Sequence, residues 1–106
     1  MKQIVLEYPN GRMVLNMERF FPCTAAIGKK VFPMIKRYAS EEDKKELEKY
    51  LVTCIRNGQT VSESLFADAE KYGENPTHTK LLKAEAKSMV TEWKRAQRNL
   101  SMLGGT

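Results

Sequence analysis

Residues 3–17, QIVLEYPNGRMVLNM, contain two runs of alternating apolar and polar residues on either side of Pro9-Asn10-Gly11. Alternation with a period of two is typical of a strand with one buried face, and an Asn-Gly step between two such runs is a strong hairpin signal. A lone hairpin is marginal in water, so its apolar face needs helices to pack against. This stretch therefore predicts an α+β fold that begins with a β-hairpin.

Two registers fit this hairpin. A two-residue Asn10-Gly11 loop pairs Tyr8 with Met13 and places every large side chain of that face together. The further pairs in this register are Leu6 with Leu15 and Ile4 with Met17. A three-residue loop, in which Pro9 opens a type I turn and Gly11 forms a bulge, shifts the pairing by one residue. We prefer the first register because it unifies the apolar face.

The rest of the chain has helical spacing of apolar residues. Thr24 can cap a helix in which Pro33 must produce a kink or a restart. Ser40, followed by three acids, starts the next helix, and Asn57-Gly58 is typical of a stop. Asn75 precedes a final long helix with proline at its first position. The predicted single domain has a hairpin at about 3–17, helices at about 25–38, 41–56, 61–72 and 76–100, and a tail at 101–106.

Length and composition agree with this organisation. The chain has 106 residues, enough for one core, and is 42% hydrophobic and 29% charged, which is typical of a soluble globular domain. No apolar run is long enough to span a membrane, and the start MKQIVLEY lacks the apolar region of a secretory signal. Cys23 and Cys54 lack CxxC spacing, so we expect free thiols in a reducing compartment. We therefore predict a cytoplasmic protein without a membrane segment.

Catalytic and metal chemistry have little support in the residue pattern. The single histidine, His78, has no cysteine, acid or second histidine at ligand spacing. Neither Cys23 nor Cys54 has a nearby histidine that could act as a base. The six glycines form no phosphate-binding loop. We predict no enzyme activity, no metal and no cofactor.

Helical-wheel positions separate the bases from the predicted core. In the first helix the predicted core face is Ile27, Val31, Met34, Ile35 and Tyr38. In the last helix, apolar residues recur in steps of four and three and form a seam of Leu82, Ala86, Met89, Trp93, Ala96, Leu100 and Leu103. The basic stripe of this helix lies roughly 140° from the seam. Charge and core are thus on different sides of both helices.

Positive charge is concentrated in these two helices. The net charge is +5, and residues 24–38 carry four bases and no acid, whereas residues 76–106 carry six bases and two acids. Clustered lysine and arginine attract phosphates regardless of base sequence. The expected nucleic-acid-binding residues are Lys29, Lys30, Lys36, Arg37, Lys80, Lys83, Lys87, Lys94 and Arg98. The plain alternative is a solvated helix face in which lysine serves solubility and helix propensity.

The seam of the last helix supports a second hypothesis. Its spacing matches a coiled coil over about three heptads, so two copies could pair through the seam. The residues of this alternative homodimer are Leu82, Met89, Trp93 and Leu100. We favour packing of the seam against its own chain. The acids of the third helix, Glu63, Asp68, Glu70 and Glu74, would instead be attracted to a partner's basic channel.

An N-terminal LEYPNGRMVL hairpin followed by compact Lys- and Glu-rich helices resembles small accessory proteins of phages and other mobile elements, of the anti-CRISPR kind. The resemblance concerns the style of the whole chain and assigns no residue a role. It implies an inhibitor that occupies an RNA- or DNA-binding channel of a CRISPR-type ribonucleoprotein. We therefore expect a non-enzymatic protein that binds nucleic acid or a nucleic-acid-handling protein. The alternative is a protein-interaction or homodimerisation module.

Overall fold

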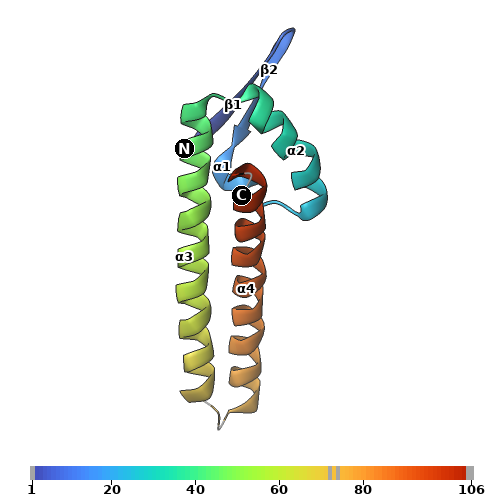
Figure 1. Ribbon diagram of the computed structural model, residues 1–106. Coiled ribbons are helices and arrows are strands. Elements are labelled where there is room, and N and C mark those ends of the chain that lie inside the picture. The colour runs from blue at the N-terminus through green and yellow to red at the C-terminus, as the bar shows by residue number, and fades with distance from the viewer. Residues whose placement is uncertain (1, 72, 74, 105–106) are drawn as a thin grey trace.

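The computed structural model describes residues 2–71, 73 and 75–104. In chain order its elements are β1 (Gln3–Tyr8), β2 (Gly11–Asn16), α1 (Met17–Phe20), α2 (Ala25–Tyr38), α3 (Glu41–Lys71) and α4 (Pro76–Gly104). The long helices α3 and α4 run antiparallel, and the β-hairpin, α1 and α2 gather where α3 begins and α4 ends (Figure 1). The predicted α+β fold, a hairpin packed on about four helices, is confirmed.

The β-hairpin has a different loop from both predicted registers. Tyr8 pairs with Gly11, so the loop consists of Pro9 and Asn10. Proline favours the second position of a type I turn and glycine favours its fourth position, which are the places of Pro9 and Gly11. No described non-glycine residue has a positive φ, so Asn10 does not adopt the left-handed conformation of an Asn-Gly loop. The preferred register was wrong by two positions, and an even slip keeps the same side chains on each face.

The helix α3 is continuous, so the predicted helices at 41–56 and 61–72 and the stop between them were wrong. Its start is the predicted one, since Ser40 Oγ accepts a hydrogen bond from the backbone N–H of Asp43 at 3.1 Å. Gly58 faces α4, and a Cβ added there would lie 2.5 Å from the Cβ of Trp93. The glycine therefore permits close approach of two helices rather than ending one.

The helix α2 begins at the predicted cap, where Thr24 Oγ1 accepts a hydrogen bond from the backbone N–H of Ile27 at 3.4 Å. Pro33 lies inside α2 and does not divide it. The predicted core face was wrong at Ile27, which is 44% exposed, whereas Phe32 is 2% exposed. Gly28 is also buried. The buried face of α2 is thus rotated toward Gly28 and Phe32, because this is the side on which α4 packs.

The seam of α4 packs on α3 within the chain. Ala86 and Ala96 are fully buried in this contact. Near the turn between the helices, Thr79 Oγ1 donates a hydrogen bond to the carbonyl of Ala69 at 3.5 Å. The predicted tail was wrong for residues 101–104, because α4 continues to Gly104. Residues 105–106 of that tail lie outside the described residues.

A buried asparagine fixes the start of α2 on α4. Asn99 is fully buried, and its Oδ1 accepts a hydrogen bond from the backbone N–H of Cys23 at 2.9 Å. Its Nδ2 donates to the Cys23 carbonyl at 3.2 Å. Both backbone groups of Cys23 are therefore satisfied away from water. The hydropathy pattern missed Asn99, since it predicts apolar residues on a core face.

The main core lies at the end of the molecule where the β-hairpin, α1 and α2 meet the long helices. Its fully buried large apolar side chains are Ile4, Leu6, Met17, Phe32, Ile35, Leu47 and Leu51. The carboxylate of Asp43 accepts from the backbone N–H of Val5 at 3.1 Å and so covers the outer edge of β1. The far part of α3 and α4 extends beyond this core, which gives the molecule its extents of 61 × 26 × 20 Å.

Candidate nucleic-acid interface

Four lysines lie on the side of α4 that faces away from α3. Lys80, Lys83, Lys87 and Lys94 are all exposed, and their spacing keeps them on one side of the helix. The row from Lys80 to Lys94 is about 21 Å long, at about 1.5 Å per residue. In the described part of the chain, none of these lysines forms an ion pair. Three of them border a shallow surface hollow of about 450 Å³.

Arg98 does not belong to this exposed row. It is half-buried, and its Nη2 donates a hydrogen bond to the Cys23 carbonyl at 3.2 Å. Its Nε atom is buried without a hydrogen bond in the structure. The guanidinium therefore helps to hold the start of α2, a contact that the sequence could not indicate because Cys23 lies 75 residues away.

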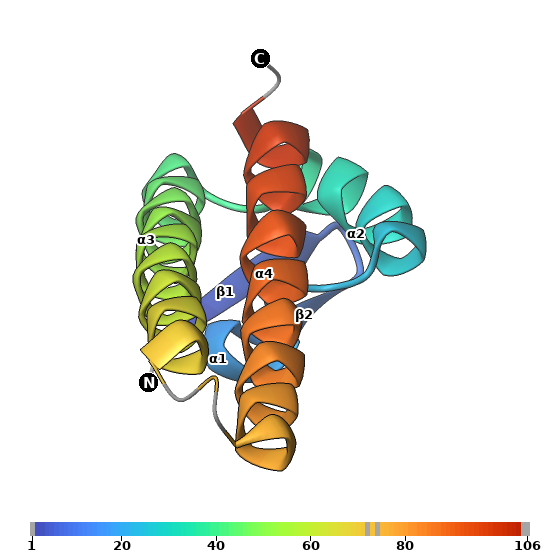
Figure 2. The same cartoon turned by 90° about the horizontal axis from the view of Figure 1, so that it is seen from below.

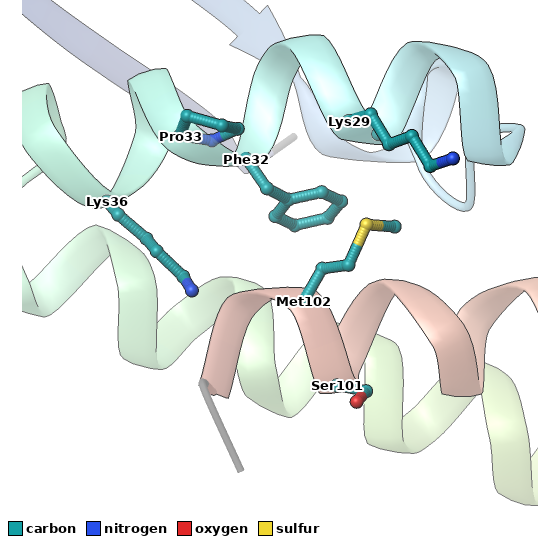
Figure 3. A pocket seen from close by; sticks show the side chains of 7 residues that line it. Lys29, Phe32, Pro33, Lys36, Ser101 and Met102 are labelled. Atoms are coloured by element: carbon teal, nitrogen blue, oxygen red, sulfur yellow. The ribbon is translucent and has the colours of Figure 1, made fainter.

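Two lysines of α2 border a pocket of about 440 Å³ between α2 and the last turns of α4 (Figure 3). Lys29 and Lys36 flank it, and Phe32 and Met102 extend into it from the two helices. Ser101 borders the same pocket from α4. The pocket combines an apolar centre with positive charge on two sides.

The other two bases of α2 are not part of this pocket. Lys30 and Arg37 are exposed. The guanidinium carbon of Arg37 lies 5.4 Å from the centre of the Tyr38 ring, a cation–π distance. The predicted α2 set therefore divides into a pair at the pocket and a pair elsewhere on the helix.

The α4 row and the α2 pocket lie along one edge of the molecule. Ser101 follows Lys94 by seven residues, so both occupy the same side of α4. Because Ser101 borders the pocket with Lys29 and Lys36, the row leads directly to these two lysines. We call Lys29, Lys36, Lys80, Lys83, Lys87 and Lys94 the lysine edge. Figure 2 shows α2 beside the C-terminal half of α4.

The predicted acidic segment lies on the far half of α3. Glu63, Asp68 and Glu70 belong to this helix, beside the first half of α4. Glu74, the fourth predicted acid, lies outside the described residues. The far end of the molecule thus has an acidic helix next to a basic one.

Comparison with protein-family models, curated proteins and solved structures finds no match to this chain.

The described residues contain no group of three or more histidine, cysteine or acidic side chains that could hold a metal ion. Within the same residues, no helix is both long and apolar enough to cross a membrane.

Both cysteines are free thiols. Burial raises the pKa of the Cys23 thiol, and burial also raises the pKa of the Cys54 thiol, with the Glu92 carboxylate adding to the rise. Burial and the neighbouring Cys54 raise the pKa of Tyr50 to about 12. Since thiolates are the nucleophilic form of cysteine, these environments favour the unreactive protonated form at neutral pH.

Proposed function

We propose that this protein binds nucleic acid through the lysine edge. The observation that carries the proposal is the alignment of six exposed lysines from two helices, none of them in an ion pair among the described residues. Lysine ammonium groups attract phosphates and release the counterions condensed on them. The α4 row of about 21 Å spans about six base pairs of a duplex, at a rise of about 3.4 Å per base pair along the axis.

The proposed binding is to the nucleic-acid backbone rather than to the bases. The aromatic ring at the pocket, Phe32, is 2% exposed and is therefore not available for stacking on a base. Phosphate contacts position a protein but carry no sequence information. A narrower form of this proposal is inhibition of a ribonucleoprotein through the RNA or DNA that it holds.

The test uses a charge reversal on α4 and a matched reversal on α3. The triple variant Lys80→Glu, Lys83→Glu and Lys87→Glu changes exposed side chains of the lysine edge. The control changes three exposed bases of α3, Lys45, Lys49 and Arg56, to glutamate. Both variants lower the net charge equally, so a difference between them reports position rather than total charge.

Affinity for a labelled single-stranded RNA and a DNA duplex is measured by fluorescence anisotropy over a salt series. We expect the α4 variant to lose affinity and to reduce the salt slope by about 2 to 3, since each phosphate contact contributes about 0.7 to 0.9. The α3 control should retain the slope of the original protein. Equal losses in both variants, or no salt-sensitive binding by the original protein at low ionic strength, would contradict the proposal.

A further inference from the structure

The pocket between α2 and the last turns of α4 has positive charge and no acid among the described residues that line it. Lys29 and Lys36 border it from α2. Both lysines are exposed, and neither forms an ion pair within the described part of the chain. Their ammonium groups are therefore available to an anion that enters the pocket.

The centre of the pocket is apolar and is built by both helices. In Figure 3, Phe32 of α2 and Met102 of α4 extend into the same space. Pro33 borders this space from α2. Phe32 is 2% exposed, whereas Pro33 is exposed and Met102 is half-buried. An apolar ligand would therefore rest mainly on Pro33 and Met102, above the Phe32 ring, and would displace water from them.

Met102 gives this apolar centre an adaptable surface. A Cβ added to Gly28 would lie 2.6 Å from Cε of Met102, so the methionine methyl group lies against the backbone of α2. The methionine side chain is unbranched and flexible, and such side chains adjust to ligands of different shape. Contact between α2 and α4 thus closes the pocket with a side chain that can move.

The two lysines lie at separate ends of the apolar centre. They are seven residues apart, which keeps them on one side of α2 at about 10.5 Å along its axis. In Figure 3 their side chains do not converge. One anionic group therefore meets one lysine, and a ligand that uses both lysines needs an anionic group at each end.

We propose that this pocket binds a small organic dianion with an elongated apolar body and a carboxylate or similar anionic group at each end. The apolar body lies over Pro33 and Met102, and the anionic groups meet Lys29 and Lys36. The pocket volume of about 440 Å³ is within the range of small-molecule sites, about 300 to 1,000 Å³. A nucleic-acid backbone supplies the charges but has no apolar body to cover the centre.

This site goes beyond nucleic-acid binding and is measured without nucleic acid. Lys87 is the nearest to the pocket of the three lysines changed in the α4 variant, and it lies about 21 Å along α4 from Ser101. This distance exceeds the Debye length of about 8 Å at physiological ionic strength. The α4 triple variant should therefore keep its affinity for the dianion within about twofold, so the failure of one proposal is distinguishable from the failure of the other.

The first test compares three ligands on the nuclease-treated full chain at physiological ionic strength, with backbone amide NMR shifts as the measurement. We expect decanedioate to bind with a dissociation constant of about 1 mM or lower and to shift amides of α2 and the last turns of α4. Decanoate should bind about fivefold more weakly, because it lacks one of the two ion pairs. Butanedioate should bind at least about tenfold more weakly, because it neither covers the apolar centre nor reaches both lysines.

Three results of this comparison would overturn the proposal. The first is no binding of decanedioate at about 10 mM, ten times the expected dissociation constant. The second is an affinity for decanoate or butanedioate equal to that for decanedioate. The third is a set of shifted amides that lies outside α2 and the last turns of α4.

The second test uses two matched double variants of α2. Lys29→Gln with Lys36→Gln removes both charges from the pocket, and Lys30→Gln with Arg37→Gln removes two exposed charges elsewhere on the helix. Both pairs are seven residues apart, and both variants lose the same charge. We expect the pocket variant to bind decanedioate about fivefold more weakly or worse, and the control to stay within about twofold. With circular dichroism showing unchanged helical content, equal losses in the two variants overturn the proposal.

Discussion

The two ends of the α3–α4 pair are packed with side chains of different size. At the end that carries the β-hairpin and α2, the buried residues are large, as in Phe32 at 2% and Leu51 at 0% exposure. At the far end they are small: Ser62 is 4% exposed, and Ala69 is 1% exposed. Three large apolar side chains of the far end are exposed, namely Val61 at 44%, Phe66 at 38% and Leu81 at 65%.

This difference separates the source of stability from the surfaces available for binding. Burial of large apolar side chains supplies most of the free energy of folding, so the end near α2 should dominate the stability. Small residues at the far end bring two helix backbones close together but bury little apolar area. The far end therefore presents charged side chains and Phe66 outward, and the lysine edge begins there.

The largest expected effect comes from Phe32→Ala at the end of the molecule that carries the β-hairpin and α2, here called the packed end. We expect a loss of about 3 to 5 kcal/mol in the free energy of unfolding, the range for aromatic truncation in a core. Leu81→Ala at the far end should change it by less than about 0.5 kcal/mol, because that side chain is mostly exposed. Urea unfolding of both variants measures the contrast. Similar losses at both ends would show that stability is spread evenly along the molecule.

Asn99→Ala tests how much the contact between α4 and the start of α2 contributes to the free energy of unfolding. The change leaves the backbone N–H of Cys23 without a partner and removes one of two donors to its carbonyl. We expect a loss of about 1 to 3 kcal/mol in the free energy of unfolding for the unpaired buried group. Gln97→Ala, at an exposed position two residues away, is the control. An Asn99→Ala loss no larger than that of the control would argue against a stabilising role for the hydrogen bonds between Asn99 and the Cys23 backbone.

Gly58→Ala tests the close approach that leads into the far end. Alanine raises helix propensity by about 1 kcal/mol relative to glycine, so an unconstrained position would be stabilised. At Gly58 the new Cβ would lie 2.5 Å from the Trp93 Cβ, so the helices must move apart. We expect a net loss of about 1 to 3 kcal/mol, the usual effect of overpacking. Thr60→Ala is the exposed control, and a stabilised Gly58→Ala protein would refute the contact.

The smallest expected effect is an alkaline loss of stability at the packed end. The pKa values of Cys23, Cys54 and Tyr50 are raised in the folded chain, the last from 10.0 to about 12. The unfolded chain therefore releases these protons at lower pH and binds fewer of them in this range. The free energy of unfolding should be unaffected below about pH 7.5, where thiols are protonated in both states, and should fall as the pH rises through the unfolded-state pKa values of about 8.5 for thiols and about 10 for tyrosine.

Urea unfolding at increasing alkaline pH measures this decline. The double variant Cys54→Ala and Tyr50→Phe should show a shallower decline than the original protein, because two of the three groups no longer titrate. The comparison is between slopes, so a uniform change in stability caused by the substitutions does not affect it. Equal slopes in the two proteins would indicate that other groups govern the alkaline response.

Local sequence signals were sufficient where a segment's own chemistry decides its structure. The caps at Thr24, Ser40 and Asn75 all accept hydrogen bonds from the helices that follow them. The alternating runs of residues 3–17 predicted the hairpin, and the spacing of lysines on α4 predicted its exposed basic side. These features depend on neighbours within one turn or one strand, so composition and spacing contain the necessary information.

Only the tertiary structure decided the features that depend on distant neighbours. By itself, Asn57-Gly58 is a helix stop, and only the position of Trp93 makes the glycine a contact between two helices. From the sequence, Arg98 is predicted to be a surface base. Only the structure shows that it donates a hydrogen bond to the carbonyl of Cys23, 75 residues away. The sequence determined which residues are apolar, basic or good caps, because these are properties of each side chain and its local spacing. Which of them meet was decided by the packing of α2 and α3 on α4, since contact energies arise only when the elements are brought together.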